Sequence, residues 1–218
     1  MRILITGSSK GIGRAVALYF LEKGHEVLGI DLLPSSIENS KYSHYIADIS
    51  KPESLPELKE INVIINNAGV QNNNDIDVNL KGTINVTKKY AFQKDIKSVL
   101  FNASASSRSG FEFPEYAASK GGVVAYMKNV AVELAKYGAT VNSISLGGVL
   151  TESNKPVMED KESWNKIMEV TPLKKWMSLE EVCEWFYFLT IINKSMSGQD
   201  LLVDNGELNL NSTFVWPK

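Results

Sequence analysis

The pattern of apolar and polar residues divides the chain into two kinds of segment, which alternate along it. Short aliphatic and β-branched runs, typical of strands covered on both faces, are separated by stretches in which apolar residues recur every three or four positions, as in helices. The expected strands are Arg2–Thr6, Glu26–Asp31, Ser43–Ala47, Asn62–Asn66, Ser98–Ala103, Thr140–Ser145 and Leu201–Val203. The expected helices are Gly11–Lys23, Pro52–Glu60, Asp77–Lys94, Glu115–Tyr137, Lys161–Val170 and Leu179–Asn193.

This alternation predicts an α/β fold, with a doubly wound parallel sheet of about seven strands and helices on both faces. The 218 residues are 44% apolar and 22% charged, which suffices for one sizeable core. No linker divides the chain, so residues 1–218 are expected to form a single domain.

Composition excludes several classes of function. The net charge of −2 and the absence of a basic block argue against nucleic acid or an anionic membrane as partner. One cysteine, Cys183, and two histidines leave no disulfide framework and no expected metal site. No apolar run is long enough for a transmembrane helix, and a strand-like run starts directly after Met1, so a cytoplasmic protein is expected.

A glycine-rich loop, TGSSKGIG at Thr6–Gly13, connects the first expected strand to the first helix. Glycines permit a tight turn and let backbone N–H groups approach a pyrophosphate at the start of the helix. The loop therefore predicts dinucleotide binding. Its expected cofactor-binding residues are Gly7, Ser9, Lys10, Gly11, Ile12 and Gly13.

Asp31 ends the second expected strand, where an acid can accept hydrogen bonds from both hydroxyls of the adenosine ribose. Its charge would repel a 2′-phosphate, so Asp31 favours NAD over NADP. Lys10 points the other way, since a cation in the loop could meet that phosphate. Neither Leu32 nor Leu33 supplies the positive charge that an NADP site needs.

Tyr116 and Lys120 lie four residues apart and therefore share one face of a helix. A lysine cation can lower the pKa of a phenol from about 10, and such a tyrosine can exchange a proton with a substrate oxygen. The same spacing recurs at Tyr19–Lys23 and Tyr90–Lys94. Neither of those pairs has a serine at the carboxyl end of a neighbouring strand, so Tyr116 and Lys120 are the candidate catalytic pair.

Together these motifs resemble the short-chain dehydrogenase/reductase family, from about Ile3 to Gly206. The matching segments, in order, are Thr6–Gly13, Asp48, Asn66–Gly69, Asn79, Tyr116–Lys120, Asn142–Thr151 and Ser197–Gly206. The resemblance implies a Rossmann-type domain that transfers a hydride between NAD(H) and a secondary alcohol or ketone, and a homodimer or homotetramer. The alternative is a regulatory or scaffold protein that binds NAD without turnover.

Roles for individual residues follow from the resemblance. Tyr116 would be the general acid/base, Lys120 would hold the nicotinamide ribose and lower the phenol pKa, and Asn79 would support a water in a proton relay. The implied adenine contacts are Asp48 and Ile49. The implied ribose, nicotinamide and pyrophosphate contacts are Asn67, Ala68, Gly69, Gly147, Val149 and Thr151.

The family also places a serine at the end of the fifth strand, usually about 13 residues before the tyrosine. That count leads to Ala103, which has no hydroxyl. Aligning the strand itself assigns the role to Ser104, 12 residues before Tyr116, with Ser106 as second choice and Ser107 or Ser109 behind them. A hydroxyl there would stabilise negative charge on the substrate oxygen.

Two departures from the family pattern concern the substrate. Only nine residues separate Gly69 from Asn79, and the loop Val70–Asp77 is polar and acidic. Leucine replaces the usual proline in the turn at Leu146-Gly147, which is expected to loosen it.

The segment 152–176 is the expected substrate lid. Its tryptophans and methionines would either face a semi-apolar substrate or pack the lid onto the body. Arg108 and Glu112 are candidates for reading a charged substrate at the mouth of the pocket.

Overall fold

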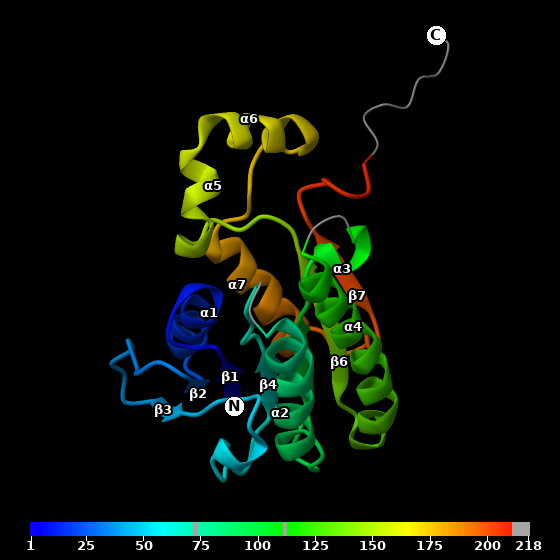
Figure 1. Cartoon of the computed structure of the whole chain (residues 1–218). Coiled ribbons are helices and arrows are strands. Elements are labelled where there is room, and N and C mark those ends of the chain that lie inside the picture. Colours follow the sequence, from blue (N-terminus) through cyan, green and yellow to red (C-terminus); the bar gives the residue numbers. More distant parts are fainter. Residues whose placement is uncertain (72–73, 111–112, 211–218) are drawn as a thin grey trace.

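The computed structural model describes residues 1–71, 74–110 and 113–210, and these contain one seven-stranded parallel sheet (Figure 1). The strand order is β3-β2-β1-β4-β5-β6-β7. The strands are β1 (Arg2–Thr6), β2 (Glu26–Asp31), β3 (Tyr42–Ile46), β4 (Val63–Asn66), β5 (Ser98–Asn102), β6 (Thr140–Leu146) and β7 (Asp200–Val203). The predicted α/β architecture is therefore confirmed.

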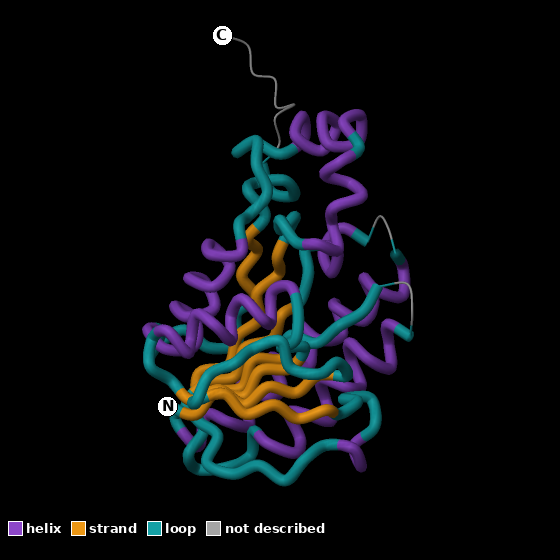
Figure 2. Tube along the Cα trace, turned by 90° about the vertical axis from the view of Figure 1, so that its left-hand side faces the viewer, coloured by secondary structure: helices purple, strands orange, loops and turns teal. Residues whose placement is uncertain are grey.

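Helices cover both faces of the sheet (Figure 2). One face carries α1 (Gly11–Glu22) and α7 (Leu179–Tyr187), and the other carries α2 (Thr83–Tyr90) and α4 (Pro114–Leu134). The remaining helical segments are η1 (Pro52–Ser54), η2 (Ile76–Gly82), α3 (Ser106–Ser109), η3 (Ala135–Tyr137), η4 (Glu152–Asn154), α5 (Lys155–Glu159), α6 (Lys161–Val170) and η5 (Phe188–Ile192).

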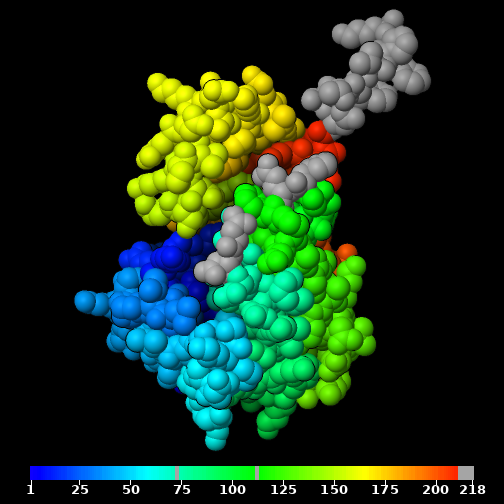
Figure 3. Space-filling model, viewed as in Figure 1, coloured from blue at the N-terminus to red at the C-terminus, as the bar shows by residue number. Residues whose placement is uncertain are grey.

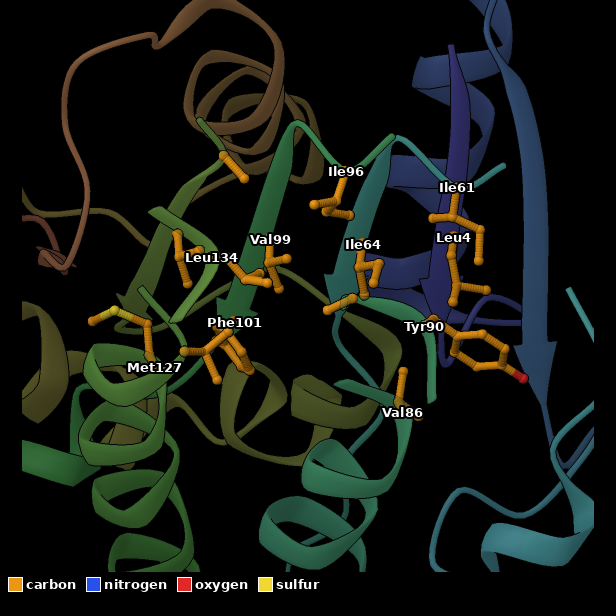
Figure 4. Packing of buried hydrophobic residues seen from close by; sticks show 14 of the residues in the cluster. Leu4, Ile61, Ile64, Val86, Tyr90, Ile96, Val99, Phe101, Met127 and Leu134 are labelled. Atoms are coloured by element: carbon orange, nitrogen blue, oxygen red, sulfur yellow. The ribbon is translucent and has the colours of Figure 1, made fainter. Parts of the chain in front are cut away.

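Successive strand residues feed two separate apolar layers. Leu4 and Ile64 belong to the layer under α2 and α4, whereas Ile3 and Ile5 belong to the layer under α1 and α7. Figure 4 shows the first layer, with strand residues such as Val99 close to helix residues. Burial of each such side chain contributes roughly 1.5–3 kcal/mol, which accounts for the continuous apolar runs in β1 and β4.

The strand order reverses between β1 and β4, and a ligand crevice is expected outside the carboxyl ends at such a point. The two strand ends are tied together there. Thr6 Oγ1 accepts hydrogen bonds from the backbone N–H groups of Asn67 and Ala68, both at 3.0 Å. The Asn67 side chain returns a hydrogen bond to the Thr6 carbonyl at 3.0 Å.

The predicted helix Pro52–Glu60 is wrong beyond its first turn. Only η1 forms, and Leu55 is extended with φ −68° and ψ 128°. The cause is Pro56, because a proline ring disfavours helical geometry in the residue before it. The predicted helix Asp77–Lys94 is present in two parts, a π-helical η2 that leads into α2.

The segment with α5 and α6 lies beyond the carboxyl ends of the strands and forms a distinct lobe (Figure 3). No helix among the described residues is long and apolar enough to span a membrane.

Candidate active site

A cleft of about 770 Å³ opens at the carboxyl ends of the strands. Most of the residues predicted for the site line it: Gly7, Lys10, Gly11, Ile12, Asp31, Asp48, Ile49, Asn67, Ala68, Gly69, Ser104, Tyr116, Lys120, Gly147, Val149 and Thr151. Three predicted residues, Ser9, Gly13 and Asn79, are not part of its lining. Segments that are far apart in the sequence thus meet in one cleft.

The first turn of α1 faces this cleft without a side-chain cap. Lys10 at the N-cap makes no capping hydrogen bond, and the first turn has no acidic residue. The first N–H groups of a helix lack intrahelical partners and carry partial positive charge. Gly13 lets the loop fold tightly, because a Cβ at this position would lie 2.0 Å from the Gly7 carbonyl oxygen. This arrangement fits the pyrophosphate of a dinucleotide.

The Asp31 carboxylate is fixed at the edge of the cleft. Its two oxygens accept backbone N–H hydrogen bonds from Ser9 and Leu33, each at 2.9 Å. The Leu33 carbonyl is held in turn by the Ser9 hydroxyl at 3.2 Å and by His44 Nε2 at 2.8 Å. The sequence reasoning missed this role of His44, which is visible only once β3 lies beside β2.

Asp48, for which the resemblance predicts an adenine contact, lines the cleft. Its Oδ1 accepts hydrogen bonds from the Ser50 backbone N–H at 3.0 Å and from the Ser50 hydroxyl at 2.7 Å. These hydrogen bonds lower the pKa of Asp48. Asp48 therefore closes its own local turn as well as facing the cleft.

Tyr116 and Lys120 project from the same side of α4. Lys120 Nζ lies 5.7 Å from the centroid of the Tyr116 ring and donates a hydrogen bond to the Asn102 carbonyl at 2.8 Å. Lys120 is only 5% exposed, and burial lowers its pKa to about 8. Asn102 was not foreseen: its side-chain amide also donates to Asn67 Oδ1 at 3.0 Å, which links β5 to β4.

The pKa of Tyr116 is raised, opposite to the lowering predicted from its spacing to Lys120. Burial of the phenol is the largest cause, because it penalises the charged form. A hydrogen bond with Ser104 acts in the opposite direction, and the Asp75 carboxylate adds to the increase. The phenol is therefore held in its protonated form.

Ser104 is the serine that the structure brings to Tyr116. It lines the cleft and is 8% exposed, whereas Ser106, Ser107 and Ser109 do not line it. The backbone N–H of Ser106 donates to Ser104 Oγ at 3.2 Å. Ser106 therefore supports Ser104 rather than replacing it.

Asn79 lies behind the cleft, where η2 packs against α4. Its side-chain amide exchanges two hydrogen bonds with the backbone of Val70, at 2.8 and 2.9 Å, and donates to Ser119 Oγ at 3.0 Å. The Ser119 hydroxyl donates to the Tyr116 carbonyl at 2.7 Å. Gly69 lies against this cluster, since a Cβ there would lie 3.1 Å from Asn79 Oδ1 and 3.4 Å from Lys120 Nζ.

The tryptophans of segment 152–176 pack against each other and against the turn at Gly148. Trp164 meets Trp176 edge to face at 5.1 Å, and Trp176 covers Gly148 so closely that a Cβ there would lie 2.0 Å from its Nε1. From segment 152–176, only the polar residues Ser153 and Asn154 line the cleft. These contacts favour the packing alternative over a semi-apolar substrate surface.

The turn after β6 is held on both sides despite its missing proline. Trp176 covers Gly148, and the Gly147 N–H donates to the Val203 carbonyl at 3.0 Å.

Arg108, a candidate for reading a charged substrate, does not line the cleft. It forms an ion pair with Asp200, with 2.6 Å between Nη2 and Oδ2. Glu112 lies outside the described residues. Within the described ranges, no group of three or more histidine, cysteine or acidic residues could hold a metal ion.

Comparisons with known proteins agree with this geometry. A family model described as enoyl-(acyl carrier protein) reductase matches residues 7–207. The 3-oxoacyl-[acyl-carrier-protein] reductase FabG of Staphylococcus epidermidis is 28% identical and covers 93% of this chain and 97% of its own length. The 2-dehydro-3-deoxy-D-gluconate 5-dehydrogenase of Bacillus subtilis is 25% identical and covers 94% of both chains.

Solved structures share the fold. A 4-hydroxyisoleucine dehydrogenase complexed with NADH matches with a TM-score of 0.85 at 24% identity, covering 96% of this chain and 99% of its own. A gluconate 5-dehydrogenase from Burkholderia cenocepacia, in complex with NADP and tartrate, also has a TM-score of 0.85 and 24% identity, covering 96% of both chains. The fold therefore accommodates NADH in one protein and NADP in another.

Proposed function

This chain belongs to the short-chain dehydrogenase/reductase family, whose members are oxidoreductases that use a nicotinamide dinucleotide. On this basis we propose the following roles for its residues. Ser104, Tyr116 and Lys120 form the reacting end of the cleft, and Asn79 supports them from behind. The substrate is a small secondary alcohol or ketone. The observation that carries this proposal is that one cleft is lined by the uncapped α1 loop at one end and by Ser104, Tyr116 and Lys120 at the other.

The cofactor supplies or accepts the hydride when bound, and the protein handles the proton. During carbonyl reduction the Tyr116 hydroxyl donates its proton to the substrate oxygen, and the Ser104 hydroxyl donates a hydrogen bond to that same oxygen. During alcohol oxidation Tyr116 accepts the proton instead. Lys120, fixed by the Asn102 carbonyl, places a positive charge beside the phenol and stabilises its anion.

For the cofactor, we propose a preference for NAD(H). The Asp31 carboxylate lines the cleft and is held in place by the backbone of Ser9 and Leu33. A 2′-phosphate beside it would bring two negative charges together in a partly dehydrated site. Leu32 and Leu33 are 64% and 45% exposed and offer no compensating charge. Lys10, which also lines the cleft, is the cation that could favour a 2′-phosphate.

Titration with NADH and NADPH, followed by nicotinamide fluorescence, tests this proposal. The wild-type protein is expected to bind NADH more tightly than NADPH. Asp31→Asn removes the negative charge and keeps the shape of the side chain, so it should reduce the difference between the two affinities. Lys10→Met is the matched variant: if Lys10 meets the 2′-phosphate, this substitution should weaken NADPH binding more than NADH binding. Tighter binding of NADPH by the wild type would refute the preference, and binding of neither cofactor would refute the proposed function.

A further inference from the structure

A buried carboxylate stands next to the proposed proton-transfer residues. Asp75 is 2% exposed and immediately precedes η2, in the short segment between Gly69 and Asn79. In the sequence, nine residues separate Gly69 from Asn79, and Asp75 is one of them. The side chain of Asp75 lies behind the cleft lining, next to the Asn79 amide. None of the roles assigned above to the other site residues accounts for it.

Asp75 is connected through Asn79 to α4, the helix that carries Tyr116 and Lys120. Its Oδ1 lies 3.5 Å from Asn79 Nδ2. That same amide donates to Ser119 Oγ at 3.0 Å, and the Ser119 hydroxyl donates to the Tyr116 carbonyl at 2.7 Å. Two side chains, Asn79 and Ser119, therefore connect the Asp75 carboxylate to the backbone of Tyr116.

Asp75 also acts on both titrating groups of the site. Burial lowers the pKa of Lys120 to about 8, and the Asp75 carboxylate opposes this decrease. Burial raises the pKa of Tyr116, and Asp75 raises it further, against the effect of Ser104. An anion in a buried site stabilises a nearby ammonium and destabilises a nearby phenolate.

Other charged groups on the surrounding elements are engaged elsewhere. On η2, Asp77 pairs with Lys81 at the surface, with 2.6 Å between Oδ1 and Nζ. On α3, Arg108 pairs with Asp200, and on α4, Glu115 is exposed. Within the part of the chain that the structure describes, Asp75 is the one charged group that affects both Tyr116 and Lys120.

We propose that Asp75, buried against the Asn79 amide, is a positioning residue whose charge holds Lys120 as an ammonium and keeps Tyr116 as a phenol. The inference rests on the proposed function, whose general acid/base is Tyr116. A protonated phenol is the form that donates a proton to a carbonyl, so Asp75 biases the site toward reduction near neutral pH. Oxidation, which needs the phenolate, is displaced to higher pH.

Asp75→Asn should lower the pKa of both Lys120 and Tyr116. Removal of the anion lowers the pKa of Lys120, because the ammonium loses its stabilising neighbour. It also lowers the pKa of Tyr116, because the phenolate loses a repelling neighbour. Both groups move in the same direction, so the alkaline limb of carbonyl reduction and the acidic limb of alcohol oxidation both shift to lower pH, by about one unit.

The experiment compares the wild type with Asp75→Asn, Asp75→Glu and the surface control Asp77→Asn. The pH profile of kcat/KM is recorded in both directions. Independently of any substrate or cofactor, a carbon-13 NMR titration follows the tyrosine ring, with the Tyr116 resonance assigned by its loss in Tyr116→Phe. Asp75→Asn should lower the pH at which Tyr116 titrates. Asp75→Glu, which keeps the negative charge, and Asp77→Asn should both show the wild-type pH profile.

Loss of kcat in Asp75→Asn without a shift of either limb would assign Asp75 a purely structural role and overturn the proposal. An unchanged Tyr116 resonance would do the same. If Asp75→Asn does not fold, Asp75→Ser removes the charge with a smaller side chain and is held to the same outcomes. A protein that turns over no substrate would refute the proposed function, and the NMR titration would still decide the role of Asp75.

Discussion

At the scale of residues, the proposed chemistry depends on three side chains and on the backbone carbonyl that holds one of them. Tyr116, Lys120 and Ser104 carry functional groups at informative spacings, and the structure places all three in one cleft. Asn102 contributes to Lys120 through its backbone carbonyl, which every residue possesses, so no residue type points to it. The direction of the Tyr116 pKa shift likewise depends on burial, which spacing along a helix does not determine.

At the same scale, the assignment of the active serine can be tested. Ser104→Ala removes the hydroxyl that lines the cleft and should lower kcat by about 10²–10³, the usual loss for one donor to a developing oxyanion. Because Ser104 also lowers the pKa of Tyr116, its removal should move the acidic limb of alcohol oxidation to higher pH.

Ser106→Ala is the matched control for this prediction. Ser106 contacts Ser104 through its backbone N–H, which the substitution keeps, so kcat should stay close to the wild-type value. A larger loss in Ser106→Ala than in Ser104→Ala would reverse the assignment.

At the scale of elements, alternation of apolar segments predicted the strands and the main helices, because strands covered on both faces and amphipathic helices have distinct periods. Local chemistry produced the exceptions. Pro56 stopped the helix expected over Pro52–Glu60, although the residue pattern there is otherwise permissive. The π-helical geometry of Ile76–Gly82 has no apolar period of its own, so only the structure shows how Asp75 and Asn79 are placed.

The close approach of α1 to the β1 loop gives a prediction for stability. Gly13→Ala places a Cβ 2.0 Å from the Gly7 carbonyl oxygen, and both groups are backbone-bound, so the loop must deform. The free energy of unfolding should fall by about 1–3 kcal/mol, as for an overpacked site, and dinucleotide affinity should fall with it.

Gly121→Ala provides the comparison within a helix. Its Cβ would meet nothing closer than the Ser107 carbonyl oxygen at 3.9 Å, so alanine should raise the free energy of unfolding by about 0.5–1 kcal/mol. Chemical denaturation of both variants checks the pair. Equal stability of Gly13→Ala and the wild type would contradict the tight packing of the loop.

At the scale of the whole molecule, seven parallel strands in the observed order place the carboxyl ends of β1 and β4 beside each other, which is where the cleft forms. The sequence predicted this architecture and the class of reaction. It did not predict the substrate, since the residues of segment 152–176 that line the cleft, Ser153 and Asn154, are not part of any motif. A homodimer or homotetramer and a cytoplasmic location remain predictions.

The central claim is that this cleft transfers a hydride and that Tyr116 handles the accompanying proton. The most direct measurement is a spectrophotometric screen of sugars, polyols, hydroxysteroids and 3-oxoacyl thioesters with both cofactors, run on the wild type, Tyr116→Phe and Tyr19→Phe. At least one compound should be turned over by the wild type and by Tyr19→Phe, while Tyr116→Phe loses about 10²–10⁴ in kcat and keeps its cofactor affinity. Full activity of Tyr116→Phe, or tight cofactor binding with no hydride transfer to any compound, would contradict the claim.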